Sequence, residues 1–162
     1  MRKIGMCLCV ALGLAVSPAS QTVRTQNSDA KRLLGGWRLV SVTQGGEVRL
    51  DPTRGPKPTG VIYYDATGNM AAQIMPDPAI RRAYAGAQPT SDEAKAALVG
   101  YTAYFGTYTV DERARTVTHH RKGNIHPAVL SDLVRRYEFL SNDRVVLLPT
   151  ESQNRLVWER IK

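Results

Sequence analysis

Two adjacent histidines, His119 and His120, are the residues best suited to chemistry, and His126 follows six positions later. A histidine titrates near neutral pH, so a single one inside a pocket can take up or release a proton. Tyrosine hydroxyls could act as its partners and donate to a carbonyl or an enolate; the candidates are Tyr104, Tyr108 and Tyr137. Such a pair in an apolar pocket is suited to isomerisation or cyclisation.

A metal site is not expected from these histidines. Zinc needs three or four ligands that converge on one point, whereas neighbouring residues of a strand point to opposite faces. Only one of His119 and His120 can therefore point inward. We favour His120, although Val117 shares a face with His119 and argues for the opposite assignment. We expect no cofactor.

The elements that must position these residues are short β-rich segments separated by turn residues. The expected strands are residues 37–43, 47–50, 61–64, 70–75, 104–110, 116–122, 133–140, 145–148 and 156–161. Short connections predict a meander of antiparallel hairpins, which closes into a barrel or folds into a sandwich. A barrel of eight to ten strands removes the unpaired edges and leaves an interior wide enough for one small ligand.

One helix interrupts the strands. Thr90 and Glu93 have the spacing of a capping box, so we expect a short helix near residues 91–100. The preceding residues, 76–89, contain three prolines and are long enough for a lid over an open barrel end. Arg81 and Arg82 in this segment could then pair with an acidic ligand group. An ordinary surface loop is the alternative.

The N-terminus has the pattern of a secretory signal peptide. Met1–Lys3 is basic, Ile4–Val16 is apolar but too short to span a bilayer, and small residues precede Ser20. We expect residues 1–19 to be removed, residues 20–32 to form a flexible lead-in and residues 33–162 to form one domain. The protein would then be exported, periplasmic or secreted, with no stable membrane insertion after cleavage and without Cys7 and Cys9.

Composition narrows the possible partners. The chain is 43% hydrophobic and 22% charged, as in ordinary soluble domains, and 22 Lys+Arg against 14 Asp+Glu give a net charge of +8. The cations are scattered in pairs such as Arg135-Arg136 rather than gathered in a stripe, so we expect no nucleic-acid binding. The sequence also has no Gly-x-Ser-x-Gly elbow, His-Glu-x-x-His motif or phosphate loop.

Five blocks in order along the chain resemble the bacterial and fungal lipocalin-like domain family. They are GGWRLVSV from Gly35, GVIYYDATGNMAAQIM from Gly60, GYTAYFGTYTVDERARTVTHH from Gly100, VRRYEFLSNDRVVL from Val134 and LVWER from Leu156. The resemblance implies an all-β, antiparallel up-and-down barrel with a ligand cavity. It also implies that Trp37 closes one barrel end under an arginine from the last strand, for which Arg160 is the candidate. Related barrels include both carriers and enzymes.

Alternation along the strands suggests which side chains line the interior. The residues expected to contact a ligand are Tyr63, Met75, Tyr104, Tyr108, Arg135, Tyr137 and Trp158. We therefore expect an exported protein that binds a small, largely apolar molecule able to carry an acidic group. The alternatives are an isomerase or cyclase that uses His119 or His120 with a tyrosine, and a structural or interaction module with a filled barrel. The oligomeric state is not indicated.

Overall fold

The computed structural model describes residues 28–48, 53–80 and 83–162. The expected signal peptide, most of the lead-in and the Arg81-Arg82 pair lie outside these residues. Within them the chain forms α1 (Asp29–Leu33), β1 (Gly35–Gln44), β2 (Glu47–Val48), β3 (Thr59–Tyr64), β4 (Asn69–Met75), a short 3-10 helix (Pro78–Ile80), α2 (Ser91–Val99), β5 (Thr102–Asp111), β6 (Thr116–Asn124), β7 (Leu133–Phe139), β8 (Arg144–Pro149) and β9 (Asn154–Arg160).

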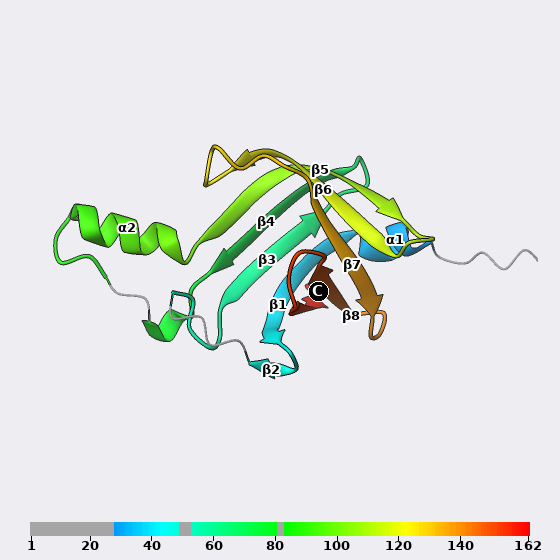
Figure 1. Ribbon diagram of the computed structural model, residues 1–162, viewed down its shortest axis with the longest axis horizontal. Helices are drawn as coiled ribbons and strands as arrows, with labels where there is room; N and C mark the ends of the chain where they lie inside the picture. The colour runs from blue at the N-terminus through cyan, green and yellow to red at the C-terminus, as the bar shows by residue number, and fades with distance from the viewer. Residues whose placement is uncertain (1–27, 49–52, 81–82) are drawn as a thin grey trace, which may run out of the picture.

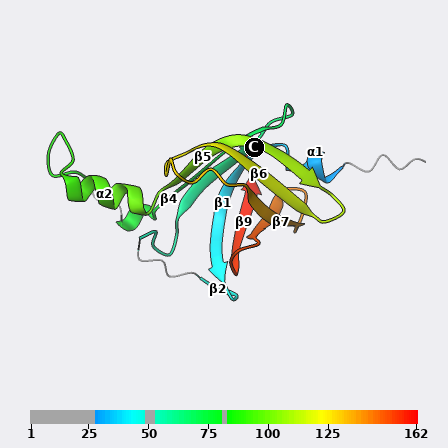
Figure 2. The same cartoon turned by 45° about the horizontal axis from the view of Figure 1, so that its top comes forward.

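The strands form one closed antiparallel barrel (Figures 1 and 2). β1 pairs with β3, each later strand up to β9 pairs with the one before it, and β9 returns to pair with β1. The sheet is closed by pairing of β1 with β9, in the register Trp37↔Arg160 and Leu39↔Trp158. The short β2 pairs with the last residues of β1. The expected all-β barrel with a short helix near residues 91–100 is confirmed, with eight strands in the closed ring among the residues described.

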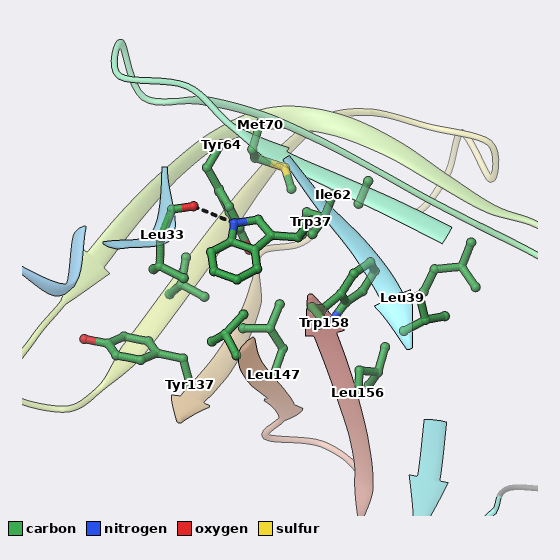
Figure 3. Close-up of a cluster of buried hydrophobic side chains, with 14 of the residues drawn as sticks. Leu33, Trp37, Leu39, Ile62, Tyr64, Met70, Tyr137, Leu147, Leu156 and Trp158 are labelled. Carbon is green, nitrogen blue, oxygen red and sulfur yellow. Dashed lines mark hydrogen bonds between the residues drawn. The ribbon is translucent and has the colours of Figure 1, made fainter. Parts of the chain in front are cut away.

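Alternation of side chains builds the interior. Along β4, Met70, Ala72 and Ile74 are buried, whereas the residues between and after them are not. The same period places a single hydrophobic core inside the ring (Figure 3). Its members are Leu33, Trp37, Leu39, Ile62, Tyr64, Met70, Ala72, Ile74, Tyr104, Val117, Tyr137, Val145, Leu147, Leu156 and Trp158.

α1 and Trp37 close one end of the barrel. Trp37 is fully buried and its Nε1–H donates to the Leu33 carbonyl at 2.8 Å (Figure 3). The Arg160 guanidinium lies 4.2 Å from the centre of the Trp37 ring and donates to the carbonyls of Leu34 and Arg32, both at 2.7 Å. The expected cover of Trp37 by Arg160 is confirmed.

The expectation of a flexible lead-in up to residue 32 is wrong for its last residues. Asp29–Leu33 is a helix, with the Ser28 hydroxyl accepting from the Lys31 N–H as its N-cap. Such a short helix is not stable alone. It forms here because Leu33 is buried in the barrel end and Arg160 binds the carbonyl groups at its C-terminal end.

At the opposite end of the barrel lie the longer connections. Asp77 is buried there and accepts from the N–H groups of Lys57 and Ala79, which ties the β2–β3 and β4–β5 connections together. The predicted capping box between Thr90 and Glu93 is present. α2 projects beyond the barrel, and none of its residues is buried (Figure 1). None of the helices in the described residues is long and apolar enough to cross a membrane.

Replacing Arg160 by methionine should lower the free energy of unfolding by about 2 kcal/mol, because three hydrogen bonds to carbonyl groups, the ion pair with Asp143 and the contact with the Trp37 ring are lost. Urea unfolding followed by tryptophan fluorescence measures this change. Arg155→Met is the matched control on the same strand: it removes an ion pair with Glu138 at the surface and should change stability by less than about 1 kcal/mol. Equal effects of the two substitutions would contradict the closing role of Arg160.

Candidate functional site

A small cavity lies inside the barrel on the side away from Trp37, toward the end with the longer connections. Its volume is about 20 Å³, enough for one water molecule, and about 290 Å³ when the adjoining space open to solvent is included. Its walls come from six strands and are mostly apolar: Ile62, Ala72, Ile74, Thr102, Tyr104, Arg135, Leu147, Leu156 and Trp158. The barrel interior is thus nearly filled, with one polar side.

His119 on β6 is fully buried beside this cavity. Its Nε2 lies 2.8 Å from the Tyr64 hydroxyl oxygen, and its Nδ1 lies 2.9 Å from that of Tyr104. Burial lowers the pKa of His119 well below its usual value, and the positive charge of Arg135 lowers it further. Burial, together with the nearby Tyr104, raises the pKa of Tyr64 well above its usual value. At neutral pH His119 and Tyr64 are therefore both uncharged.

Arg135 is the cation of the site. It lies on β7, is half-buried and lines the cavity, while Arg136 beside it points to solvent. It is close enough to His119 and Tyr64 for its charge to influence the pKa of each. Among the residues that the structure describes, the Arg135 side chain makes neither a hydrogen bond nor an ion pair. A guanidinium stays charged in proteins, so this positive charge at the cavity is uncompensated by a carboxylate.

Trp158 on β9 adds a second unsatisfied donor. The side chain is buried and lines the cavity, and its Nε1–H has no hydrogen-bond partner in the described part of the chain. Most buried donors in folded proteins are paired, and an unpaired one costs about 1–3 kcal/mol. Arg135 and Trp158 therefore give one region of the barrel two polar groups that its own residues do not satisfy.

Three of the seven residues expected to line a ligand cavity come together at this cavity, namely Tyr104, Arg135 and Trp158. Tyr108 and Tyr137 lie inside the barrel but near its closed end, where their hydroxyls donate to the Asp65 carbonyl at 2.8 Å and to Asp29 Oδ2 at 3.0 Å. Burial and the bond to Asp29 raise the pKa of Tyr137. Both hydroxyls are thus used within the fold.

The expected inward positions of Tyr63 and Met75 are wrong. Tyr63 is 50% exposed and Met75 is 38% exposed, because β3 and β4 turn Tyr64 and Ile74 inward instead. Tyr64 was missed because two tyrosines are adjacent and either one could face the core. No local signal separates the two, because Val61 shares a face with Tyr63 just as Ile62 shares one with Tyr64.

The preference for His120 as the inward histidine is also wrong. His120 lies on the outer face, with Nδ1 2.8 Å from Asp132 Oδ2 and Nε2 3.0 Å from the Thr109 hydroxyl. These contacts fasten the β6–β7 connection to the barrel wall. His119 is the inward residue, on the same face as the buried Val117. Within the described residues, no group of three His, Cys, Asp or Glu side chains is arranged to hold a metal ion.

Stability should depend on pH through His119. The folded state keeps His119 neutral, whereas the unfolded chain protonates it below about pH 6.5, so the unfolded state binds more protons. The free energy of unfolding should therefore fall as pH drops from 7 to 5, by up to about 1.4 kcal/mol per pH unit. Urea unfolding across this range should show a smaller slope for His119→Gln than for the wild type.

His120→Gln is the matched control for this measurement and should keep the wild-type slope, because His120 is on the outer face. An unchanged slope in His119→Gln would show that this histidine is not held neutral by the fold.

Comparisons with known proteins give a family and a likeness to solved structures. A family model described as a lipocalin-like domain matches residues 34–161. A search of curated proteins finds no match. Among solved structures, the crystal structure of a duf4847 family protein from Bacteroides vulgatus is similar, with 12% sequence identity and a TM-score of 0.41 over 80% of this chain and 94% of that one.

Proposed function

Because the chain belongs to the lipocalin-like domain family, we propose that its barrel binds a small, largely apolar molecule that carries an acidic group. The observation that carries this proposal is Arg135, a half-buried cation that lines the cavity and has no partner in the described residues. Charged groups withdrawn from water are normally paired, because desolvation without a partner is costly. A ligand carboxylate at Arg135 supplies the missing partner.

The shape of the site limits how such a ligand binds. A cavity of about 20 Å³ holds one water molecule, so a carboxylate at Arg135 displaces this water and needs the neighbouring side chains to move slightly apart. The acidic group lies at Arg135, and the apolar part extends toward the open end along walls such as Ile74 and Leu156. Drug-sized ligands usually occupy pockets of about 300–1,000 Å³, so a larger ligand requires the side chains at the open end to move apart.

The small cavity volume itself favours a second candidate function. A barrel filled by its own side chains can serve as a structural or interaction module without any ligand. The two candidates differ in what happens at Arg135. A ligand carrier requires its charge, whereas a filled module tolerates a neutral residue there and is stabilised by losing an unpaired buried cation.

The contact between His119 and Tyr104 favours a third candidate, an isomerase or cyclase. A histidine and a tyrosine in hydrogen-bond contact beside a largely apolar cavity could hold and move a proton for a bound substrate. Once a ligand is identified, its conversion separates enzyme from carrier. His119→Gln should then abolish turnover, whereas His120→Gln, on the outer face, should keep it.

Binding should depend on the acid group and on Arg135. We expect the wild-type protein to bind decanoate, and to bind decanamide at least 10-fold more weakly, in isothermal titration calorimetry. Arg135→Gln should weaken decanoate binding by about 10- to 100-fold, the range for losing a hydrogen bond to a charged group. Arg136→Gln, the neighbour that points to solvent, is the matched control and should leave affinity unchanged.

No binding of either probe by the wild type, together with greater stability of Arg135→Gln, would support the filled-barrel module instead.

Export is the second part of the proposal. It is supported by the first 19 residues, in which a basic start is followed by an apolar run and then by small residues, as in a signal peptide. When the full chain is produced in a Gram-negative host, intact mass spectrometry of the periplasmic fraction should give a protein that begins at Ser20. A protein that begins at Met1 and stays in the cytoplasm would contradict export. Lysine-rich tags at the N-terminus should be avoided, since they alter the charge pattern that a signal peptide requires.

A further inference from the structure

The hydrogens of His119, Tyr64 and Tyr104 cannot all be used in the two contacts among these three side chains. A neutral histidine carries one N–H, and each tyrosine carries one O–H, which makes three hydrogens for the two contacts at 2.8 and 2.9 Å. Each contact uses one hydrogen. One tyrosine must therefore accept from the imidazole N–H and is left with a free O–H.

The position of the two tyrosines decides which one this is. Tyr64 is buried and does not line the cavity, and its hydroxyl has His119 as its partner in the described residues. A free Tyr64 O–H would be an unsatisfied donor in the core, which is costly. Tyr104 lines the cavity, where a water molecule or a ligand atom can accept from it.

From this asymmetry we infer that His119 carries its hydrogen on Nδ1, which leaves the Tyr104 O–H free to point into the cavity. Together with Arg135, this hydroxyl selects ligands whose head group only accepts hydrogen bonds. Tyr64 donates to Nε2, Nδ1–H donates to the Tyr104 oxygen, and Tyr104 donates to the ligand. His119 and Tyr64 are thus positioning residues for ligand recognition, although neither lines the cavity. The selectivity rests on the proposed binding function.

The other polar groups at the cavity are also mainly hydrogen-bond donors. Arg135 has donors only, and the unpaired Nε1–H of Trp158 is a donor as well. Thr102 is the other hydroxyl on the cavity wall, and its oxygen already accepts from the Arg54 guanidinium at 2.7 Å. A carboxylate, which only accepts, satisfies this set. A primary amide, which has two N–H donors and one acceptor oxygen, matches this set less well.

Burial keeps the arrangement in one protonation state. The pKa of His119 is well below its usual value, so the imidazole stays neutral at physiological pH. A protonated ring would donate to both tyrosines and leave two free hydroxyl hydrogens, one of them in the core. The single orientation of the Tyr104 hydroxyl therefore follows from the fold before any ligand binds.

Nitrogen-15 NMR of the wild-type protein without ligand tests the position of the hydrogen. At pH 7 the His119 ring should show a proton on Nδ1 and a bare Nε2, assigned by comparison with His119→Gln. A proton on Nε2 would overturn the inference. This measurement needs no ligand and no variant of Tyr104, so it stands apart from the proposed function.

Titration of decanoate and decanamide tests the consequence for selectivity. Tyr104→Phe should weaken decanoate binding by about 10-fold or more and decanamide binding less, so the preference for the acid falls. Tyr63→Phe, on the outer face of β3, should change neither affinity by more than about twofold and controls for the loss of a hydroxyl. Unchanged decanoate affinity in Tyr104→Phe would overturn the role of Tyr104.

If the wild type binds neither probe, the selectivity falls with the proposed function, whereas the hydrogen position on His119 is still decided by NMR.

Discussion

Pairing of β1 with β9 is the constraint on which the rest of the structure depends. This pairing turns an open meander into a closed ring that has no unpaired edge strands. Every second side chain of the ring then points into the barrel interior. The register sets Trp37 opposite Arg160 and Leu39 opposite Trp158, so the tryptophan that closes one end and the tryptophan that lines the cavity lie on adjoining strands. Polar side chains that point inward therefore need their hydrogen-bond or charge partners inside the barrel.

Two inward arginines show how differently the ends of the barrel meet this requirement. At the closed end, Arg160 stacks on Trp37 and donates to carbonyl groups of the α1 segment, so its charge and its donors are used. Toward the open end, Arg135 lines a cavity and has no such partners in the described residues. The same residue type completes the fold at one end and leaves a charge without a partner in the described residues at the other. This contrast, rather than cavity size, favours a ligand.

His119 shows the other way to place a polar side chain in such an interior. Burial keeps the imidazole neutral, and two tyrosines occupy both of its nitrogens. An arginine cannot be neutralised in this way. Outside the barrel, His120 and Arg121 make surface contacts with Asp132 and Ser131 that hold the β6–β7 connection. Of these two adjacent histidines, His119 thus makes its hydrogen bonds inside the barrel and His120 makes its own on the outer face.

Local patterns in the sequence were sufficient for the strands and the α2 capping box, because turn residues, alternation and Thr90 with Glu93 act over a few residues. They left a barrel and a sandwich open, and the family resemblance implied the barrel. The pairing of Trp37 with Arg160 followed from the family resemblance. Alternation does not say which of two adjacent tyrosines faces inward, so the choice between Tyr63 and Tyr64 was decided only by closure of the barrel. For the histidines, Val117 was a local signal in favour of His119, and the buried face of β6 follows it. α1 is too short to form on local preferences and depends on its contacts with the barrel end. Arg135, by contrast, was placed on the face of Tyr137 by alternation, but its lack of a partner is a property of the tertiary structure alone, because pairing depends on side chains that are distant in the sequence.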